Sequence, residues 1–265
     1  MTGDGRLKRR LFIACAALTS VGARAQVADL NDAINKAGRQ RMLSQRASKA
    51  YLALVQNVES RNAQQVLDRS VMLFERQLAE LRTYAPNPTI RGTYDALGGA
   101  WNDFKRELTG TAPNRDEAAK VVKLDAAVLA LANQGTTQYE ATSGKPVGRL
   151  VNIAGRQRML SQRMAKFYLA SAMQIDPAGS TVEIGKARTE FVAALEVLRH
   201  APEATAQIRQ ELVLADAQWI FFNRGLLRLE GAGASLGLMS DVFVTSENLL
   251  EIMDRVTGLY SDLKT

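Results

Sequence analysis

An internal duplication constrains the fold of this 265-residue chain more than any other feature. Residues 37–46 read AGRQRMLSQR, and the same ten residues return at 154–163, at a constant offset of 117. A repeated packing element would keep its apolar positions and let its polar ones drift. Here the arginines, glutamines and serine have been kept together, which indicates that function fixed them. The chain is therefore expected to fold as two copies of one structure, each carrying this polar segment.

The duplication extends over most of each half of the chain. Trp101, for example, corresponds to Trp219 after one inserted residue, and each unit spans roughly 115 residues, an ordinary domain size. A cluster of turn-forming and helix-breaking residues at 142–148 marks the junction. We therefore predict a first unit at residues 26–142 and a second at 149–265.

Residues 1–25 have the pattern of an export signal. A basic start is followed by a short apolar run at 11–22 and by Ala23-Arg24-Ala25, a small-x-small cleavage site. An uncleaved membrane anchor is disfavoured, because about a dozen apolar residues are too few to cross a hydrocarbon core that needs about 20. The pair Arg9-Arg10 resembles a twin-arginine signal, and an ordinary Sec signal fits equally well. We expect a periplasmic protein, exported by a cleaved signal peptide.

Removal of this segment changes the charge of the chain. Of the 34 Lys and Arg and the 27 Asp and Glu residues, 29 and 26 lie after residue 25, so the formal net charge falls from +7 to +3. No nucleic-acid partner is expected, because such a partner favours a strongly basic surface. The single cysteine, Cys15, is removed as well, which excludes a disulfide in the exported chain.

The pattern of apolar and helix-breaking residues predicts an all-α fold. The few prolines separate stretches of about 20 to 30 residues that are rich in Ala, Leu, Gln, Glu and Arg, which favour helices. We predict four helices in each unit, and hence two tandem antiparallel four-helix bundles. The predicted ranges are 28–59, 62–84, 89–109 and 115–141 in the first unit and 149–175, 180–200, 203–230 and 235–263 in the second.

The first helix of each unit carries positive charge that its own sequence does not balance. Neither 33–58 nor 149–175 contains an Asp or Glu, although each stretch contains five Lys and Arg residues. An ordinary exposed helix interleaves both signs. Arg39 and Arg46 lie seven residues apart on one face of the first helix, and we expect that face to be exposed.

Arg41 and Arg158 project instead from stripes of small or apolar residues. One turn before them, Gly38 and Gly155 would let a second helix approach closely. A buried guanidinium is costly without a partner, and no carboxylate stands three or four residues away. The partner is therefore either a carboxylate from another helix, which would set the register of the bundle, or a bound anion. A planar guanidinium suits a planar oxyanion, because its parallel N–H groups bind two oxygens at a time.

The string INxAGRQRMLSQR resembles the signature of the PilJ-type domain, the N-terminal sensor region of type IV pilus chemotaxis transducers. It is also similar to the periplasmic sensor motif of nitrate/nitrite histidine kinases. The resemblance implies a four-helix sensor bundle in which an arginine of the first helix binds nitrate or nitrite where two first helices meet across a dimer. The resemblance predicts that Arg41, Arg158, Gly38, Gly155, Met42 and Met159 belong to the ligand-binding site. We add Gln45 and Gln162, which lie on the same helix faces as the two arginines.

The resemblance leaves the arrangement of the site open. Two fused units could supply both arginines from one chain, or each unit could pair with its equivalent in a homodimer. In the kinases the domain lies between two membrane helices, and no second membrane segment is evident here. We therefore expect signalling through a partner such as a membrane chemoreceptor or sensor kinase.

The leading hypothesis is a periplasmic, non-catalytic sensory protein for a small oxyanion, nitrate or nitrite above all. The alternative is a structural or adaptor protein that partners a chemoreceptor, sensor kinase or pilus system, with the arginines paired to protein carboxylates. An enzyme is not expected, because His200 stands alone at a helix end and Ser44 and Ser161 have no evident base. No spacing suggests a metal site, a phosphate-binding glycine loop or another cofactor.

Overall fold

The computed structural model describes residues 26–228 and 234–263, and this part of the chain consists of α-helices and short connections. The all-α prediction is confirmed. The export signal predicted at residues 1–25 lies outside the described residues. The helices of the first half are α1 (Leu30–Val55), α2 (Ser60–Tyr84), α3 (Pro88–Thr109) and α4 (Arg115–Ser143). Those of the second half are α5 (Pro146–Ala172), α6 (Pro177–His200), α7 (Ala206–Leu227) and α9 (Leu236–Ser261).

The predicted helix ends lie within four residues of the observed ones, and the largest difference is at the end of α1. α1 ends at Val55 rather than at residue 59, because Asn57 and Glu59 adopt positive φ angles of 57° and 49°. Gln174 and Asp176, at the same offset of 117, adopt φ angles of 60° and 42° after α5. Left-handed backbone ends a helix, so the two repeats turn in the same way.

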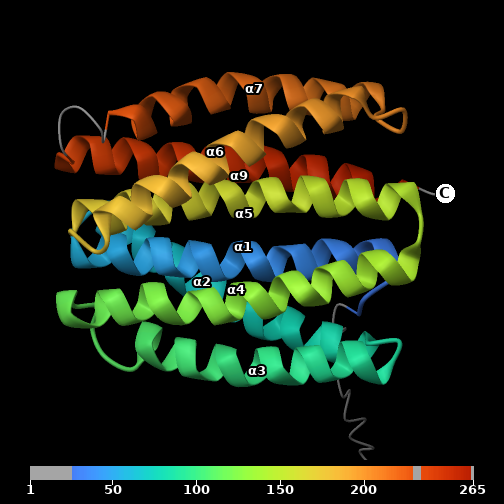
Figure 1. Cartoon of the computed structure of the whole chain (residues 1–265), viewed down its shortest axis with the longest axis horizontal. Coiled ribbons are helices and arrows are strands. Elements are labelled where there is room, and N and C mark those ends of the chain that lie inside the picture. The colour runs from blue at the N-terminus through green and yellow to red at the C-terminus, as the bar shows by residue number, and fades with distance from the viewer. Residues whose placement is uncertain (1–25, 229–233, 264–265) are drawn as a thin grey trace, which may run out of the picture.

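α1 and α5 lie side by side along the middle of the molecule (Figure 1). α2 and α4 pack on α1, whereas α6 and α9 pack on α5. α3 then packs mainly on α4 and α7 mainly on α9, so that these two helices lie at opposite edges in Figure 1. The two first helices, which carry the repeated segment, therefore form the interface between the halves.

The cores of the two halves repeat each other. Phe74 stacks on Trp101 at a centroid distance of 3.7 Å, and Phe191 stacks on Trp219 at 4.6 Å. The hydroxyl of Tyr139 in α4 donates to the Leu81 carbonyl at 2.8 Å, and that of Tyr260 in α9 donates to the Leu198 carbonyl at 3.0 Å. Leu81 and Leu198 are separated by the repeat offset, so Tyr139 and Tyr260 are equivalent, and this aligns α4 with α9 residue by residue.

Two buried lysines of the central helices join the halves. Lys49 of α1 contacts Glu247 of α9 at 2.6 Å, and Lys166 of α5 contacts Asp125 of α4 at 2.9 Å. Each lysine thus reaches a carboxylate in the other half of the chain. Because a buried cation without its partner is costly, these pairs hold the two halves together. In the described part of the chain, no helix is both long enough and apolar enough to span a bilayer.

Candidate functional site

Arg41 and Arg158 meet where α1 packs on α5. A Cβ atom placed on Gly38 would lie 3.2 Å from Nη2 of Arg41 and 3.6 Å from Nη2 of Arg158. A Cβ atom on Gly155 would lie 3.3 Å from Nη2 of Arg158 and 3.7 Å from Nη2 of Arg41. Both guanidinium groups therefore occupy the space that the two glycines leave free. The structure brings four of the predicted residues together from within one chain.

Each of these arginines also donates hydrogen bonds to the first helix of the other half. Nη2 of Arg41 donates to the main-chain carbonyl of Asn152 at 3.3 Å and to its Oδ1 atom at 2.7 Å. Nη2 of Arg158 donates to the carbonyl of Asn35 at 3.0 Å. Asn35 and Asn152 are separated by the repeat offset, so the crossing has approximate two-fold symmetry.

The symmetry breaks at the outer partner of each arginine. Nη1 of Arg158 forms an ion pair with Asp254 of α9, which also binds Arg39 at 2.8 Å. Nη1 of Arg41 donates instead to Oδ1 of Asn133 in α4, at 3.1 Å. Asn133 and Asp254 are equivalent in the alignment of α4 with α9, so one half holds an amide where the other holds a carboxylate.

Arg41 is consequently a buried cation that lacks a counter-charge of its own. It is 1% exposed, and none of the described carboxylates forms an ion pair with it. Burial, together with the neighbouring Arg156 and Arg158, lowers its pKa to about 9, although the carboxylate of Glu140, which binds the amide of Asn152, acts in the opposite direction. Burial also lowers the pKa of Arg158, which is 0% exposed, but the Asp254 carboxylate opposes this and the pKa is about 10.

Asp254 is held in its charged form by the arginines around it. Burial alone would raise its pKa, but Arg158 and Arg39 lower it to about 2. The second half of the site is therefore neutralised by a protein carboxylate. Of the two alternatives for the partner of these arginines, a carboxylate from another helix is found for Arg158 and not for Arg41 among the described residues.

A groove leads from the surface to the outer partner of Arg41. It lies between α4, α5 and α6, has a volume of about 430 Å³, and is lined by Asn133, Arg156, Met159 and Glu190, among others. Nη1 of Arg156 donates to Oδ1 of Asn133 at 3.2 Å, and Arg156 also forms an ion pair with Glu190. The groove is therefore lined by side chains of both charges and reaches Asn133, whose Oδ1 atom accepts from Arg41.

The other predicted residues take more ordinary positions. Met42 and Met159 are both part of the hydrophobic core, and Met159 also borders the groove. Nε2 of Gln45 donates to Oγ of Ser44 at 3.2 Å, and Nε2 of Gln162 donates to the Ser246 carbonyl at 2.9 Å. Neither glutamine is hydrogen-bonded to Arg41 or Arg158 within the described ranges.

The expectation that Arg39 and Arg46 are exposed is wrong. Their side chains are only 20% and 17% exposed, and they pair with Asp254 at 2.8 Å and Glu247 at 2.5 Å. Both carboxylates belong to α9 of the other half, which packs beside the charged face of α1. The sequence of α1 alone carries no sign of this neighbour.

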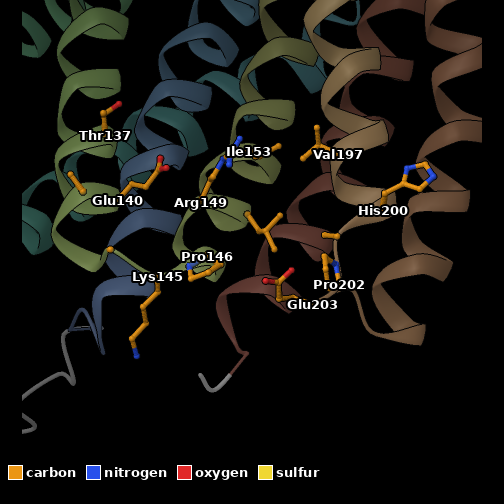
Figure 2. A pocket seen from close by; sticks show the side chains of 14 residues that line it. Thr137, Glu140, Lys145, Pro146, Arg149, Ile153, Val197, His200, Pro202 and Glu203 are labelled. Carbon is orange, nitrogen blue, oxygen red and sulfur yellow. The ribbon is translucent and has the colours of Figure 1, made fainter.

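A second cavity, of about 790 Å³, opens at the end of the bundle where α4 turns into α5 and α6 ends. Figure 2 shows Glu140, Arg149 and His200 among the residues around it. Glu140 accepts a hydrogen bond from Nδ2 of Asn152, the residue that binds Arg41. This cavity is therefore linked to the site through a single amide. Among the described residues, no group of three or more His, Cys, Asp or Glu side chains could hold a metal ion.

Asn133, Asn152 and Asp254 are the site residues that the sequence analysis missed. Asn35 and Asn152 stand inside the repeated string, but nothing in the string indicated that the carbonyl of Asn35 and the carbonyl and amide of Asn152 would accept from an arginine of the other half. Asn133 and Asp254 would have been found only by aligning the last helices through Tyr139 and Tyr260, whose surroundings have drifted in sequence.

Comparison with known proteins agrees with the duplicated architecture. No curated protein matches the chain, and no solved structure does. Residues 25–128 and 139–226 each match the family described as the N-terminal region of type IV pili methyl-accepting chemotaxis transducers. The chain therefore belongs to this PilJ family, whose sensory domain it carries twice in tandem.

Proposed function

We propose that this chain is a non-catalytic sensory protein that binds a small oxyanion, nitrate or nitrite above all, at one site shared by Arg41 and Arg158. The observation that carries the proposal is the state of Arg41, a fully buried guanidinium whose partners are an amide and a carbonyl of Asn152 and the amide of Asn133. An anion would supply the counter-charge that these neutral groups lack.

The hydrogen-bonding groups of Arg41 and Arg158 between α1 and α5 suit a planar oxyanion. The Nε atoms of Arg41 and Arg158 are buried and have no hydrogen-bond partner, so each arginine has an unused donor. Gly38 and Gly155 leave space for the two guanidinium groups to lie next to each other, where one anion could contact both. A planar anion can accept N–H groups in pairs from a guanidinium, and a water-poor site strengthens each of these bonds.

The position of α1 beside α5 supports one intramolecular site over a site shared by two molecules. In the family that the sequence resembles, two first helices meet across a dimer; here the same meeting occurs within one chain. We further propose that the protein acts in the periplasm after removal of residues 1–25. A membrane chemoreceptor or sensor kinase would read the bound state.

The test is calorimetric titration of the exported protein with nitrate, nitrite, sulfate and chloride. Saturable binding of nitrate or nitrite, with one anion per chain, is expected for the wild type. Either Arg41→Ala or Arg158→Ala should abolish it, whereas Arg76→Ala, an exposed change on α2, should not. Two anions per chain, or binding that survives both arginine changes, would refute the shared site.

The adaptor function is favoured by a different observation. Arg158 already has a protein carboxylate in Asp254, and Arg39 and Arg46 also pair with acids of α9. These contacts fix the register of α1, α5 and α9 without any ligand. A folded wild type that binds none of the four anions would favour this function, in which the arginines serve the interface between the halves.

A further inference from the structure

The outer face of α7 exposes an unusual number of large apolar side chains. α7 lies at one edge of the molecule, packed on α9 and touching α6 (Figure 1). Val213, Leu214, Ile220 and Phe221 are each between 50% and 66% exposed. Val213 and Ile220 are seven residues apart, as are Leu214 and Phe221, so all four side chains share one side of the helix. We call this surface the α7 face.

The α7 face is also positively charged. Arg209 lies at its N-terminal end, and Arg224 and Arg228 lie at its C-terminal end, all three exposed. The carboxylates of α7 point elsewhere, since Glu211 pairs with Arg255 at 3.0 Å and Asp216 pairs with Arg199 at 2.8 Å. The face therefore combines apolar side chains with cations, and none of the carboxylates within α7 (Ala206–Leu227) pairs with these three arginines in the described part of the chain.

The equivalent helix of the first half provides an internal comparison. The alignment of Trp101 with Trp219 places Asp95, Asn102 and Asp103 of α3 where α7 carries Val213, Ile220 and Phe221. In α3 the two acids pair with arginines, Asp103 with Arg106 at 2.8 Å and Asp95 with Arg82. The fold thus does not require apolar residues at these positions. The exposed apolar residues of α7 are therefore not explained by folding alone.

We propose that the α7 face binds the surface of a membrane that contains anionic lipids. Arginines on an apolar helix face complement such a surface, because guanidinium groups bind lipid phosphates while apolar side chains reach the boundary of the acyl chains. This inference is independent of the oxyanion site, which lies in the α1–α5 interface. It gives the protein a fixed position at the membrane where a receptor partner would lie.

Charge argues against a second copy of the chain as the occupant. In an antiparallel pair of α7 helices, Arg209 of one copy would lie against the C-terminal Arg224 and Arg228 of the other. In a parallel pair, each arginine would lie against itself. Like charges in direct opposition are unfavourable, whereas an anionic lipid surface meets all three arginines with opposite charge.

The experiment is flotation of the exported protein with vesicles of phosphatidylcholine alone, or of equal parts phosphatidylcholine and phosphatidylglycerol. The wild type should float with the anionic vesicles and not with the neutral ones, and added salt should weaken the binding. The double change Val213→Asp and Phe221→Asp restores the residues of α3 and should lower the binding by tenfold or more, on the order of 1.4 kcal/mol. Arg224→Ser should lower it by about fivefold.

A matched control comes from α2. Met72 is 64% exposed on α2, in the other half of the chain from α7, and Met72→Asp should leave vesicle binding unchanged. Circular dichroism should show that all variants remain helical. A wild type that ignores anionic vesicles, or an α7 double variant that floats as well as the wild type, would overturn the proposal. Self-association that the α7 double variant abolishes, without vesicle binding, would overturn it in favour of a second copy.

Discussion

Replacing Asn133 with aspartate should stabilise the protein and remove its need for an anion. Oδ1 of Asn133 accepts from Arg41 at 3.1 Å and from Arg156 at 3.2 Å. Aspartate has nearly the same shape and would place a carboxylate oxygen at the same point. The variant would then have in α4 what Asp254 provides in α9, an acid held between two arginines.

The equivalent position in the second half indicates the size of the effect. With its carboxylate, Arg158 has a pKa of about 10, whereas Arg41, without one, has a pKa of about 9. A difference of about one in pKa corresponds to about 1 kcal/mol in favour of the charged form. We therefore expect Asn133→Asp to raise the free energy of unfolding by about 1 kcal/mol at pH 7. For a protein of this size that is a rise in Tm of roughly 2–4 °C.

The assay is thermal and urea unfolding followed by circular dichroism, with and without nitrate. Nitrate should raise the Tm of the wild type and leave that of Asn133→Asp unchanged, because the carboxylate takes the place of the anion. The converse variant, Asp254→Asn, should be destabilised by a similar or larger amount. A variant Asn133→Asp that is no more stable than the wild type, while Asp254→Asn loses stability, would refute the electrostatic account of Arg41.

Three further changes test the interface and the site. Asp125→Ala should lower the free energy of unfolding by roughly 3–5 kcal/mol in urea titrations, because it leaves a buried lysine unpaired, and replacing both partners with apolar residues should cost less. Burial would raise the pKa of Glu247, but its cationic partners lower it from 4.5 to about 2. The charged Glu247 therefore stabilises the folded protein by roughly 3 kcal/mol above pH 4.5, and this contribution is lost as the pH falls towards 2. The Tm of Glu247→Gln should depend less on pH in that range than the Tm of the wild type. Gly38→Ala should weaken nitrate binding about tenfold in calorimetry by displacing Arg41, whereas Gly99→Ala, whose Cβ meets nothing within 4 Å, should not.

The sequence predicted the helices because they follow from local patterns, and it left open whether the two arginines meet within one chain or across a homodimer. The apolar period and the prolines place each helix within a few residues of its observed range. Gly38 and Gly155 have no side chain to pack and precede the arginines by one turn, which is why the close approach of a second helix could be expected; that this would be another first helix was implied only by the family resemblance. The structure then shows that these helices come from one chain.

The partners of the arginines could not be predicted in the same way. Asp254 is 96 residues from Arg158 in sequence, and nothing in α5 indicates that α9 lies beside it. Arg39 was expected to be exposed because it shares a face of the first helix with Arg46, whereas the carboxylate that covers it comes from the far half of the chain. Such pairings depend on how the two halves dock, and helical periodicity describes only one helix at a time.

The pairing of α1 with α5 inside one polypeptide has a consequence for how the two arginine neighbourhoods can differ. In a dimer of identical single units, every substitution appears on both sides of the axis, so Asn133 and Asp254 would have to be the same residue. Fusion of the units removes that constraint. The second half can keep the carboxylate of Asp254 beside Arg158, while the first half keeps the neutral amide of Asn133 beside Arg41. The outer contact of Arg41 is with α4 and that of Arg158 is with α9, and only the second is an ion pair, so the two sides differ in a way that a symmetric dimer does not allow.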